Sequence, residues 1–223
     1  MQIAILLYEG LTALDAIGPY EVFSRLPDAT VHFVARDVGP KRTDAGSLAL
    51  LADYTLVTLP HPHILVIPGG LFGTCAAMKD QQLLAWIQSA YTSSQWTTSV
   101  CTGALLLGAA GILKGLTATT HWAAQATLEH YGATYLPERF VQHGKIITAA
   151  GVSAGIDMAL HLAGEIAGRE TAQAIQLGLE YDPQPTFDAG SLQKASAATV
   201  SLARQFLRKQ AAQERARPVQ ETP

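Results

Sequence analysis

The sequence contains little charge and few aromatic residues. Only 15% of its 223 residues are charged and 7% are aromatic, while 48% are hydrophobic. Soluble domains usually carry about 25% charged residues. The composition therefore excludes disorder for the body of the chain and predicts a large core. It also suggests that a partner subunit covers part of the surface.

The sequence also lacks basic excess and long hydrophobic runs. The net charge is −3 and the pI is about 6.1, which argues against a nucleic-acid-binding face. The best apolar candidate, Gly103 to Leu113, ends at Lys114 and is shorter than the roughly 18–20 residues of a membrane span. The start, MQIAILLYEG, has no basic lead-in and no cleavage site of a secretion signal. We therefore expect a cytoplasmic protein that binds neither nucleic acid nor membrane.

The usual cofactor and metal motifs are missing as well. No GxGxxG follows the first apolar run and no GxxxxGK[ST] occurs, so neither dinucleotide nor P-loop binding has support. The two cysteines, Cys75 and Cys101, form no CxxC pair and no metal-ligand spacing. His61 and His63 flank Pro62, which is more typical of loop or core residues than of a metal site. We expect no cofactor and no metal.

Short apolar runs of strand length alternate with helical patterns along the chain. The expected strands are Ile3–Tyr8, Thr30–Ala35, Ile64–Ile67, Thr97–Val100 and Lys145–Ala149. The expected helices are Pro19–Leu26, Gln81–Tyr91, Gly103–Ala110, Trp122–Tyr131, Ile156–Ala167 and Arg169–Leu179. Uninterrupted apolar strands between helices indicate a mostly parallel sheet with helices on both faces. The predicted fold class is α/β, doubly wound.

Three stretches fall outside this alternation. Gly39–Thr43 is predicted to be a turn, and Leu48–Leu51 and Thr55–Leu59 are predicted to be short extended pieces off the main sheet. From Arg204 the chain becomes polar and basic, which is typical of a solvated helix with a frayed end. We therefore expect one domain over 1–203 and a polar C-terminal tail over 204–223.

The loops that follow the expected strands are the places to look for chemistry. In an open parallel sheet, ligands bind beyond the carboxyl ends of the strands, where the strand order reverses. These strand ends lead to Asp15, to Pro68–Gly70, to Cys101 and to Gly151–Gly155. We expect the four loops to converge if the strand order is that of flavodoxin.

Ser153, in the GVSAG sequence, is one candidate nucleophile. It fits the G-x-S-x-G turn of serine hydrolases, which also requires a histidine later in the chain. His161 is the only histidine after Ser153, and it lies on the same expected helix, about 12 Å along the axis. A serine triad is therefore excluded, and the small residues here more naturally allow close backbone approach.

Cys101 is the stronger candidate, because it lies between a short strand and an apolar helix. The N-terminus of a helix presents unpaired N–H groups and the positive end of its dipole, and both favour a thiolate. The small residues after Cys101 allow that helix to pack closely on the sheet while the thiol stands in a sharp turn. Cys75 has no strand before it, and we interpret it as structural.

A nucleophile also needs an anion stabiliser. The backbone amides of Thr102 and Gly70 are candidates for an oxyanion pocket, since glycine lets an N–H approach a ligand closely. His121, in ATTHW, is as well explained by packing or by an interface.

Asp15 is the candidate acid/base. If Pro19 is the first helical residue, Asp15 lies too far upstream to be the N-cap. A carboxyl group enclosed by apolar residues has a raised pKa and can transfer a proton near neutral pH. Glu21 could also reach the site, but from inside the helix it is expected to face solvent.

Several of these motifs together resemble the ThiJ/PfpI superfamily and, within it, the isonitrile hydratases. The resemblance runs from Met1 to about Ser191. The motifs are LDAIGPYEVF with Asp15, the PGG loop, SVCTGALLLGAAGILKG, ATTHW, GVSAGIDMAL and LGLEYDPQPTFDAGS. Aspartate rather than glutamate after the first strand, combined with Cys-Thr-Gly, indicates the hydratase branch.

The resemblance implies a flavodoxin-like fold, a homodimer, no cofactor, and hydration of an isonitrile to an N-substituted formamide. By motif position, Cys101 would be the nucleophile and Asp15 the acid/base, with Thr102 and Gly70 beside them. Members that act on aldehydes or peptides usually carry glutamate and histidine where this sequence has Asp15 and Thr102. That difference weakens those activities here.

Two other readings stay open. The same cysteine would also suit a glyoxalase- or deglycase-type reaction on α-oxoaldehydes. A non-enzymatic ligand-sensing domain, as in AraC-type regulators, is the second alternative, but it needs a DNA-binding region of roughly 100 further residues. Only the short segment 204–223 follows here, so we expect a freestanding enzyme.

Overall fold

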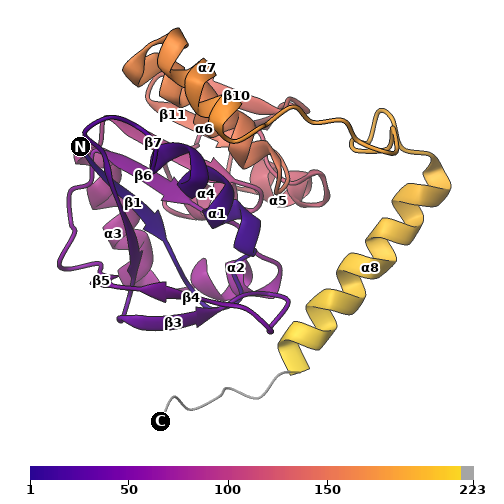
Figure 1. Ribbon diagram of the computed structural model, residues 1–223. Helices are drawn as coiled ribbons and strands as arrows, with labels where there is room; N and C mark the ends of the chain where they lie inside the picture. The colour runs from indigo at the N-terminus through magenta and orange to yellow at the C-terminus, as the bar shows by residue number, and fades with distance from the viewer. Residues whose placement is uncertain (217–223) are drawn as a thin grey trace.

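A seven-stranded sheet forms the centre of the protein, in a computed structural model that describes residues 1–216. The strands lie in the order β10-β11-β7-β6-β1-β2-β5 (Figure 1). They span Gln2–Leu6 (β1), Thr30–Ala35 (β2), Tyr54–Thr55 (β5), Ile64–Ile67 (β6), Trp96–Val100 (β7), Phe140–His143 (β10) and Ile146–Ala149 (β11). All neighbouring pairs are parallel except β10 and β11. The central order β2-β1-β6-β7-β11 is the flavodoxin-like order that we expected.

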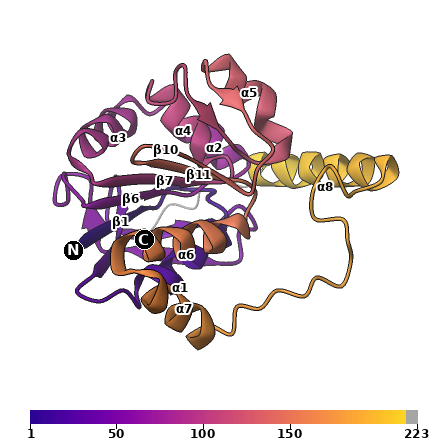
Figure 2. The ribbon, with the colours of Figure 1, turned by 90° about the horizontal axis from the view of Figure 1, so that it is seen from above.

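Helices cover both faces of this sheet, which confirms the predicted fold class (Figure 2). One face carries α1 (Ala13–Phe23), α6 (Ala154–Ala167) and α7 (Arg169–Gly178). The other carries α2 (Phe72–Ala77), α3 (Gln81–Ser93), α4 (Gly103–Ala109) and α5 (Gln125–His130). Because the sheet is covered twice, β6 is buried along its whole length. Its apolar run is therefore continuous rather than alternating.

Helix α1 begins earlier than the sequence suggested, and Asp15 lies in its first turn. Pro19, expected as the first helical residue, lies inside the helix. A proline ring normally clashes with the Cβ and backbone of the residue before it. That residue is Gly18, which has no Cβ, so the helix continues through Pro19 at the cost of one missing N–H.

The predicted turn at Gly39–Thr43 is wrong. Gly39–Arg42 forms β3, which pairs antiparallel with β4 (Ala49–Ala52) in a separate two-stranded sheet. An edge strand tolerates Pro40, because not every N–H of such a strand is needed for pairing. The extended piece near Leu48–Leu51 is thus confirmed, whereas β5 belongs to the main sheet.

The region between β7 and β11 is more divided than expected. The predicted helix over Trp122–Tyr131 is split into a short 3-10 turn, Trp122–Ala124, followed by α5. Two very short strands, β8 (Thr117–Ala118) and β9 (Thr134–Tyr135), pair with each other beside it. The antiparallel strand β10 was not predicted.

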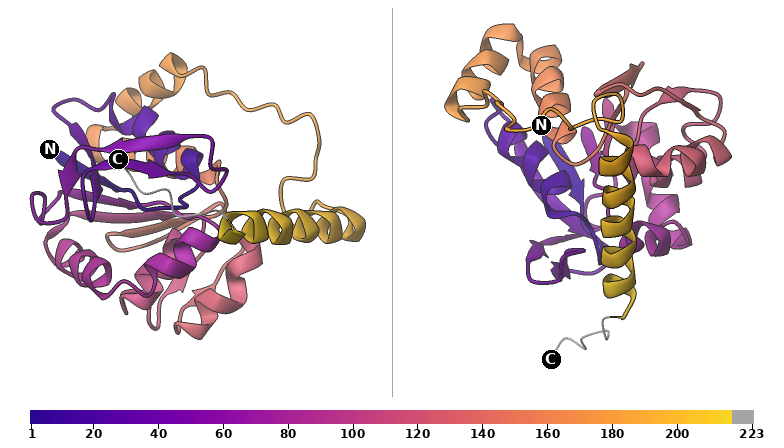
Figure 3. Two further views of the ribbon diagram at one scale, coloured as in Figure 1. Left: turned by 90° about the horizontal axis from the view of Figure 1, so that it is seen from below. Right: turned by 90° about the vertical axis from the view of Figure 1, so that its right-hand side faces the viewer.

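Helix α8 (Ala197–Ala216) stands apart from the body at the end of a long connection (Figure 3). None of its residues is buried. Its last turn contacts α2, where the Glu214 carboxylate accepts hydrogen bonds from the amides of Phe72 and Gly73, both at 2.9 Å. The expected boundary after residue 203 falls inside this helix. Residues 217–223 of the expected tail lie outside the described residues.

No described helix is long and apolar enough to cross a membrane.

The buried core predicts a simple contrast in stability. Leu106 of α4 is fully buried, so Leu106→Ala should lower the free energy of unfolding by about 2–5 kcal/mol. Leu202 of α8 is 48% exposed, and Leu202→Ala should change it by less than about 0.5 kcal/mol. Urea denaturation of both variants measures the difference. Equal losses would contradict this assignment of the core.

Candidate active site

The carboxyl ends of β1, β6, β7 and β11 meet at one edge of the sheet. The chain order reverses between β1 and β6, which is where α/β proteins of this kind bind ligands. The loop after β1 leads into α1 and Asp15, and the loop after β7 begins with Cys101. The expected convergence of the strand-end loops is confirmed.

Cys101 occupies a strained turn between β7 and α4. Its φ is +57°, in the left-handed region that side chains other than glycine rarely adopt. The backbone holds it there: the Cys101 N–H donates to the carbonyl oxygens of Ala149 at 3.1 Å and Ala150 at 2.8 Å. The Thr120 hydroxyl donates to the Cys101 carbonyl oxygen at 2.9 Å. Strain maintained in this way is typical of functional sites.

Asp15 projects into the same place from the first turn of α1 and is fully buried. Its Oδ2 accepts a hydrogen bond from the Gly69 amide at 2.9 Å. The Gly69 carbonyl oxygen accepts in turn from the Thr12 amide at 2.8 Å. The loop after β6 is therefore bonded in both directions to the start of α1, and this pairing fixes the carboxyl group.

The Asp15 carboxyl group and the Cys101 thiol form a pair. Each contributes to the pKa of the other through a side-chain hydrogen bond. Asp15 Oδ1 is buried without a hydrogen-bond partner of standard geometry among residues 1–216. The pair brings together residues that are 86 positions apart, by 101 − 15 = 86.

Burial raises the pKa of Asp15 from 3.8 to about 7. The Gly69 amide and the Cys101 thiol act in the opposite direction, because hydrogen bonds to a carboxylate stabilise its charge. The nearby Asp44 carboxylate raises the pKa slightly further. Asp15 thus exchanges its proton near neutral pH, as an acid/base group requires.

Burial and the Asp15 carboxylate also raise the pKa of the Cys101 thiol well above its usual value. Backbone amides of Val152 and Thr102 donate toward the sulfur and lower that pKa, without compensating for burial. The helix N-terminus was expected to favour the thiolate; its amide does so, but burial outweighs that effect. Two buried negative charges side by side are unfavourable, so thiolate and carboxylate do not coexist near neutral pH.

Gly69 is required by the close approach of its neighbours. A Cβ at this position would lie 2.5 Å from the Thr102 nitrogen and 3.0 Å from Asp15 Oδ2. Even an alanine methyl group does not fit there. The glycine in the PGG loop that contacts Asp15 is thus Gly69, which the sequence analysis did not single out.

The expected role of the Gly70 amide needs correction. It donates to Thr102 Oγ1 at 2.9 Å, and Thr102 Oγ1 donates to the Gly70 carbonyl oxygen at 2.7 Å. The Gly70 N–H is therefore used within the protein rather than presented to a ligand. Thr102 lies beside the pair as expected, with its amide directed at the Cys101 sulfur.

Sequence reasoning missed three further residues at this edge. Val152, with a φ of +36°, directs its amide to the Cys101 sulfur. Tyr8 is buried at the end of the first apolar run, and its hydroxyl contacts Thr74 at 3.0 Å. A tyrosine that ends an otherwise aliphatic strand was a usable signal for Tyr8. No pattern in the sequence pointed to Thr74.

The serine candidate is separate from the pair. Ser153 is exposed, and its hydroxyl oxygen accepts a hydrogen bond from Arg139 at 3.1 Å. His161 instead contacts Gln142 at 2.8 Å and stacks on Phe140. The structure therefore agrees with the exclusion of a serine triad.

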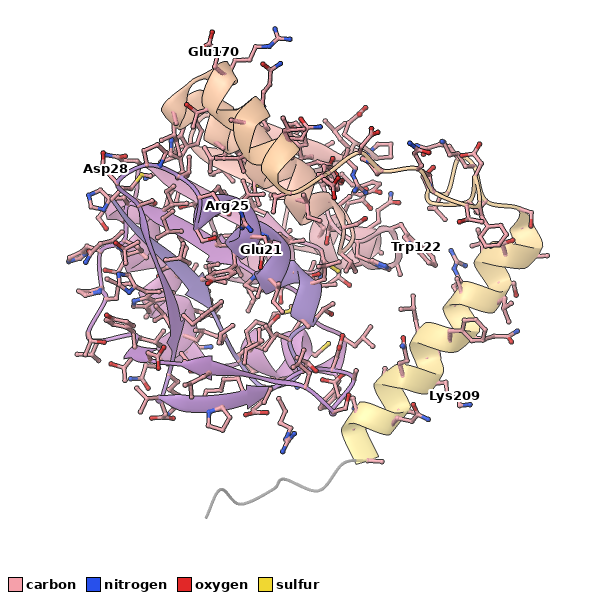
Figure 4. All side chains as sticks on the ribbon, viewed as in Figure 1. Glu21, Arg25, Asp28, Trp122, Glu170 and Lys209 are labelled. Atoms are coloured by element: carbon pink, nitrogen blue, oxygen red, sulfur yellow. The ribbon has the colours of Figure 1, made fainter. Side chains whose placement is uncertain are left out.

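The other candidates also lie outside the pair. Cys75 is exposed on α2. Glu21 forms an exposed ion pair with Arg25 at 2.7 Å on the outside of α1 (Figure 4). His121 accepts a hydrogen bond from the Ala123 amide at 3.3 Å, and burial lowers the pKa of its imidazole. Its position is explained by packing.

No group of three or more possible metal ligands occurs in the described part of the chain. His61 contacts the Ser93 hydroxyl at 3.1 Å, and His63 Nδ1 accepts from the Gln2 amide at 3.0 Å. Both histidines thus have structural partners.

The fold and the strand-end cysteine define a known class of protein. The sequence model of the DJ-1/PfpI family matches residues 1–165, and this chain belongs to that family. The expected resemblance is confirmed.

More closely, the chain is 44% identical to an isonitrile hydratase from Pseudomonas putida over 204 residues, which cover 92% of this chain and 89% of that protein. A crystal structure of a ThiJ/PfpI family protein from Pseudomonas syringae is 39% identical, with a TM-score of 0.87 over 96% of this chain and 90% of its own. DJ-1beta from Drosophila melanogaster shares the fold, with a TM-score of 0.73 at 21% identity over 80% of this chain and 97% of its own.

The raised pKa of Asp15 predicts a pH-dependent stability. Between about pH 4 and pH 7 the folded protein keeps the Asp15 proton while the unfolded chain loses it, so this group's contribution to stability falls as pH rises. Relative to wild type, Asp15→Asn should therefore gain up to about 4 kcal/mol in unfolding free energy across this range.

Urea denaturation at both ends of the range measures that gain. Asp53→Asn, at an exposed position, is the matched control and should show no such trend. A difference between Asp15→Asn and wild type that is the same at pH 4 and pH 7 would contradict the argument.

Proposed function

We propose that this protein is an isonitrile hydratase, a hydro-lyase that converts an isonitrile and water to an N-substituted formamide. One observation carries the proposal: a buried carboxyl group that exchanges its proton near neutral pH lies against a cysteine in a strained turn. The 44% identity to an isonitrile hydratase from Pseudomonas putida supports it. The reaction adds one water molecule and needs no oxidant or reductant.

In the first step, the Cys101 sulfur attacks the terminal carbon of the isonitrile. In its reactive form the pair carries one proton, which lies on the Asp15 carboxyl group when the sulfur acts as a thiolate. The new carbon–sulfur bond forms as Asp15 transfers that proton to the same carbon. The product is a thioimidate on Cys101, and Asp15 is left as a carboxylate. Covalent catalysis of this kind divides one difficult addition into two easier ones.

In the second step, water adds to the thioimidate carbon. Asp15 takes a proton from the water and passes it to the nitrogen. The tetrahedral adduct then loses its hydroxyl proton to Asp15, the carbon–sulfur bond breaks, and the formamide leaves. Cys101 is again a thiolate and Asp15 is again protonated, so one carboxyl group serves every proton transfer.

The backbone around Cys101 suits this cycle. The Thr102 and Val152 amides donate toward the sulfur, so they stabilise negative charge there when it attacks and when it leaves. The Gly69 amide donates to one carboxyl oxygen of Asp15, and the other has no hydrogen-bond partner of standard geometry among residues 1–216, so it is available for proton transfer. The thioimidate route thus uses the donors that surround the pair.

A pair of cysteine variants tests the assignment with cyclohexyl isonitrile as substrate. Cys101→Ala should lower turnover at least about a thousandfold, because the nucleophile is gone. Cys75→Ala, at the exposed cysteine, should keep wild-type turnover. Formamide production followed by chromatography is the measurement. Full activity in Cys101→Ala, or its loss in Cys75→Ala, would refute the proposed nucleophile.

The same assay should include methylglyoxal. The same cysteine would also suit chemistry on an α-oxoaldehyde. Turnover of methylglyoxal without turnover of the isonitrile would replace hydration of isonitriles by the glyoxalase- or deglycase-type reaction. Activity on neither substrate would favour the ligand-sensing alternative.

We further propose a cytoplasmic homodimer. The low charge content supports a covered surface, and light scattering of the purified protein should give about twice the mass of 23.7 kDa. A monomer at micromolar concentration would contradict this.

A further inference from the structure

Three hydroxyl groups, those of the buried Tyr8 and Thr74 and of the half-buried Thr102, form a connected network beside the active-site pair. The Tyr8 hydroxyl donates to the Pro68 carbonyl oxygen at 2.9 Å and contacts Thr74 Oγ1 at 3.0 Å. Thr74 Oγ1 lies 2.9 Å from both the Gly70 carbonyl oxygen and Thr102 Oγ1, and its single proton serves one of these contacts at a time. Tyr8 and Thr74 are 8% and 1% exposed. The network therefore belongs to the protein interior.

This network bonds to the residues on either side of Gly69. Pro68 is held by Tyr8, and Gly70 is held by Thr74 and Thr102. Gly69 itself contacts none of the three hydroxyls by a hydrogen bond; its N–H donates to Asp15 Oδ2. The hydroxyls thus fix both ends of a three-residue segment whose middle amide contacts the acid/base group.

We propose that Tyr8 and Thr74 are positioning residues, which hold the Gly69 amide against Asp15 and so set the pH at which Asp15 exchanges its proton. That this proton serves catalysis rests on the proposed function. The positioning itself does not.

The chemistry of the network supports this role. A phenylalanine would fill the space of Tyr8 and would avoid burying a hydroxyl, which is costly unless that group is hydrogen-bonded. The Tyr8 hydroxyl meets this requirement by bonding to the loop. Fully satisfied buried networks make their surroundings rigid. A rigid loop keeps the Gly69 N–H directed at Oδ2, where it stabilises the carboxylate.

Other charged groups face this region and must be considered. Asp15 lies near Cys101 from β7 and near Asp44 from the loop after β3. Tyr8 lies near Asp15 and Cys101 and also near Glu214 of α8. Cys101, Asp44 and Glu214 remain in the variants proposed below, so a change in the titration of Asp15 reports on the loop.

The test removes one hydroxyl at a time and titrates Asp15 directly. Carbon-13 NMR of protein labelled in aspartate carboxyl groups, assigned with Asp15→Asn, gives the midpoint. Tyr8→Phe and Thr74→Val should each raise this midpoint by about half a pH unit to one unit, because the carboxylate loses its amide donor. The acidic limb of the pH profile of kcat/KM should move by the same amount.

Two controls separate positioning from general damage. Tyr20→Phe removes a half-buried tyrosine hydroxyl of α1 outside the network, and should leave the midpoint unchanged. Thr74→Ser keeps the hydroxyl and should restore the wild-type midpoint. Thermal unfolding confirms that each variant is folded. An unchanged or lowered midpoint in both Tyr8→Phe and Thr74→Val, or an equal rise in Tyr20→Phe, would overturn the proposal.

The NMR titration needs no turnover, so the two proposals fail separately. If wild type does not hydrate isonitriles but the midpoint rises in Tyr8→Phe, the positioning role stands and the proposed function falls. If wild type is active and the midpoint does not move, the reverse holds.

Discussion

The site depends on one constraint: a carboxyl group is buried against a thiol with a single backbone amide of standard geometry among residues 1–216 to stabilise its charge. Burial raises the pKa values of both groups, so the pair near neutral pH carries at most one negative charge. The properties of Asp15 and Cys101 thus follow from their burial together.

Burying this pair and holding Cys101 in a strained conformation destabilise the fold. Hydrogen bonds with neighbouring backbone groups offset that cost. The strained Cys101 is held by the carbonyl oxygens of Ala149 and Ala150 from the end of β11. Asp15 is held by Gly69, from the end of β6. Each reactive side chain is therefore fixed by a strand other than the one that delivers it. This arrangement is possible because the parallel strands all end at one edge.

Sequence patterns predicted which helices and strands form better than the residues at which they begin and end. The strands Thr30–Ala35 and Ile64–Ile67 have the predicted bounds. Ile64–Ile67 is an apolar run buried along its whole length, whereas only the end of Thr30–Ala35 is fully buried. Local signals failed where tertiary packing overrides them. Pro19 lies inside α1, where Gly18 leaves no Cβ for its ring to meet, and Gly39–Arg42 is a strand because β4 pairs with it. The Gly70 amide was expected to donate to a ligand in an oxyanion pocket, but it donates to the Thr102 hydroxyl instead.

The amino-acid sequence by itself determined the α/β class, the order of the central strands and their helices, and the two residues that meet at the site, because periodicity and strand-end position are local properties. Only the tertiary structure decided the protonation of that pair, the correct glycine and the parts played by Tyr8, Thr74 and Val152. Burial and hydrogen bonding depend on which segments come together in space. The hydrogen bond from Gly69 to Asp15 joins residues 54 positions apart, so local sequence patterns do not reveal it or its effect on the pKa of Asp15.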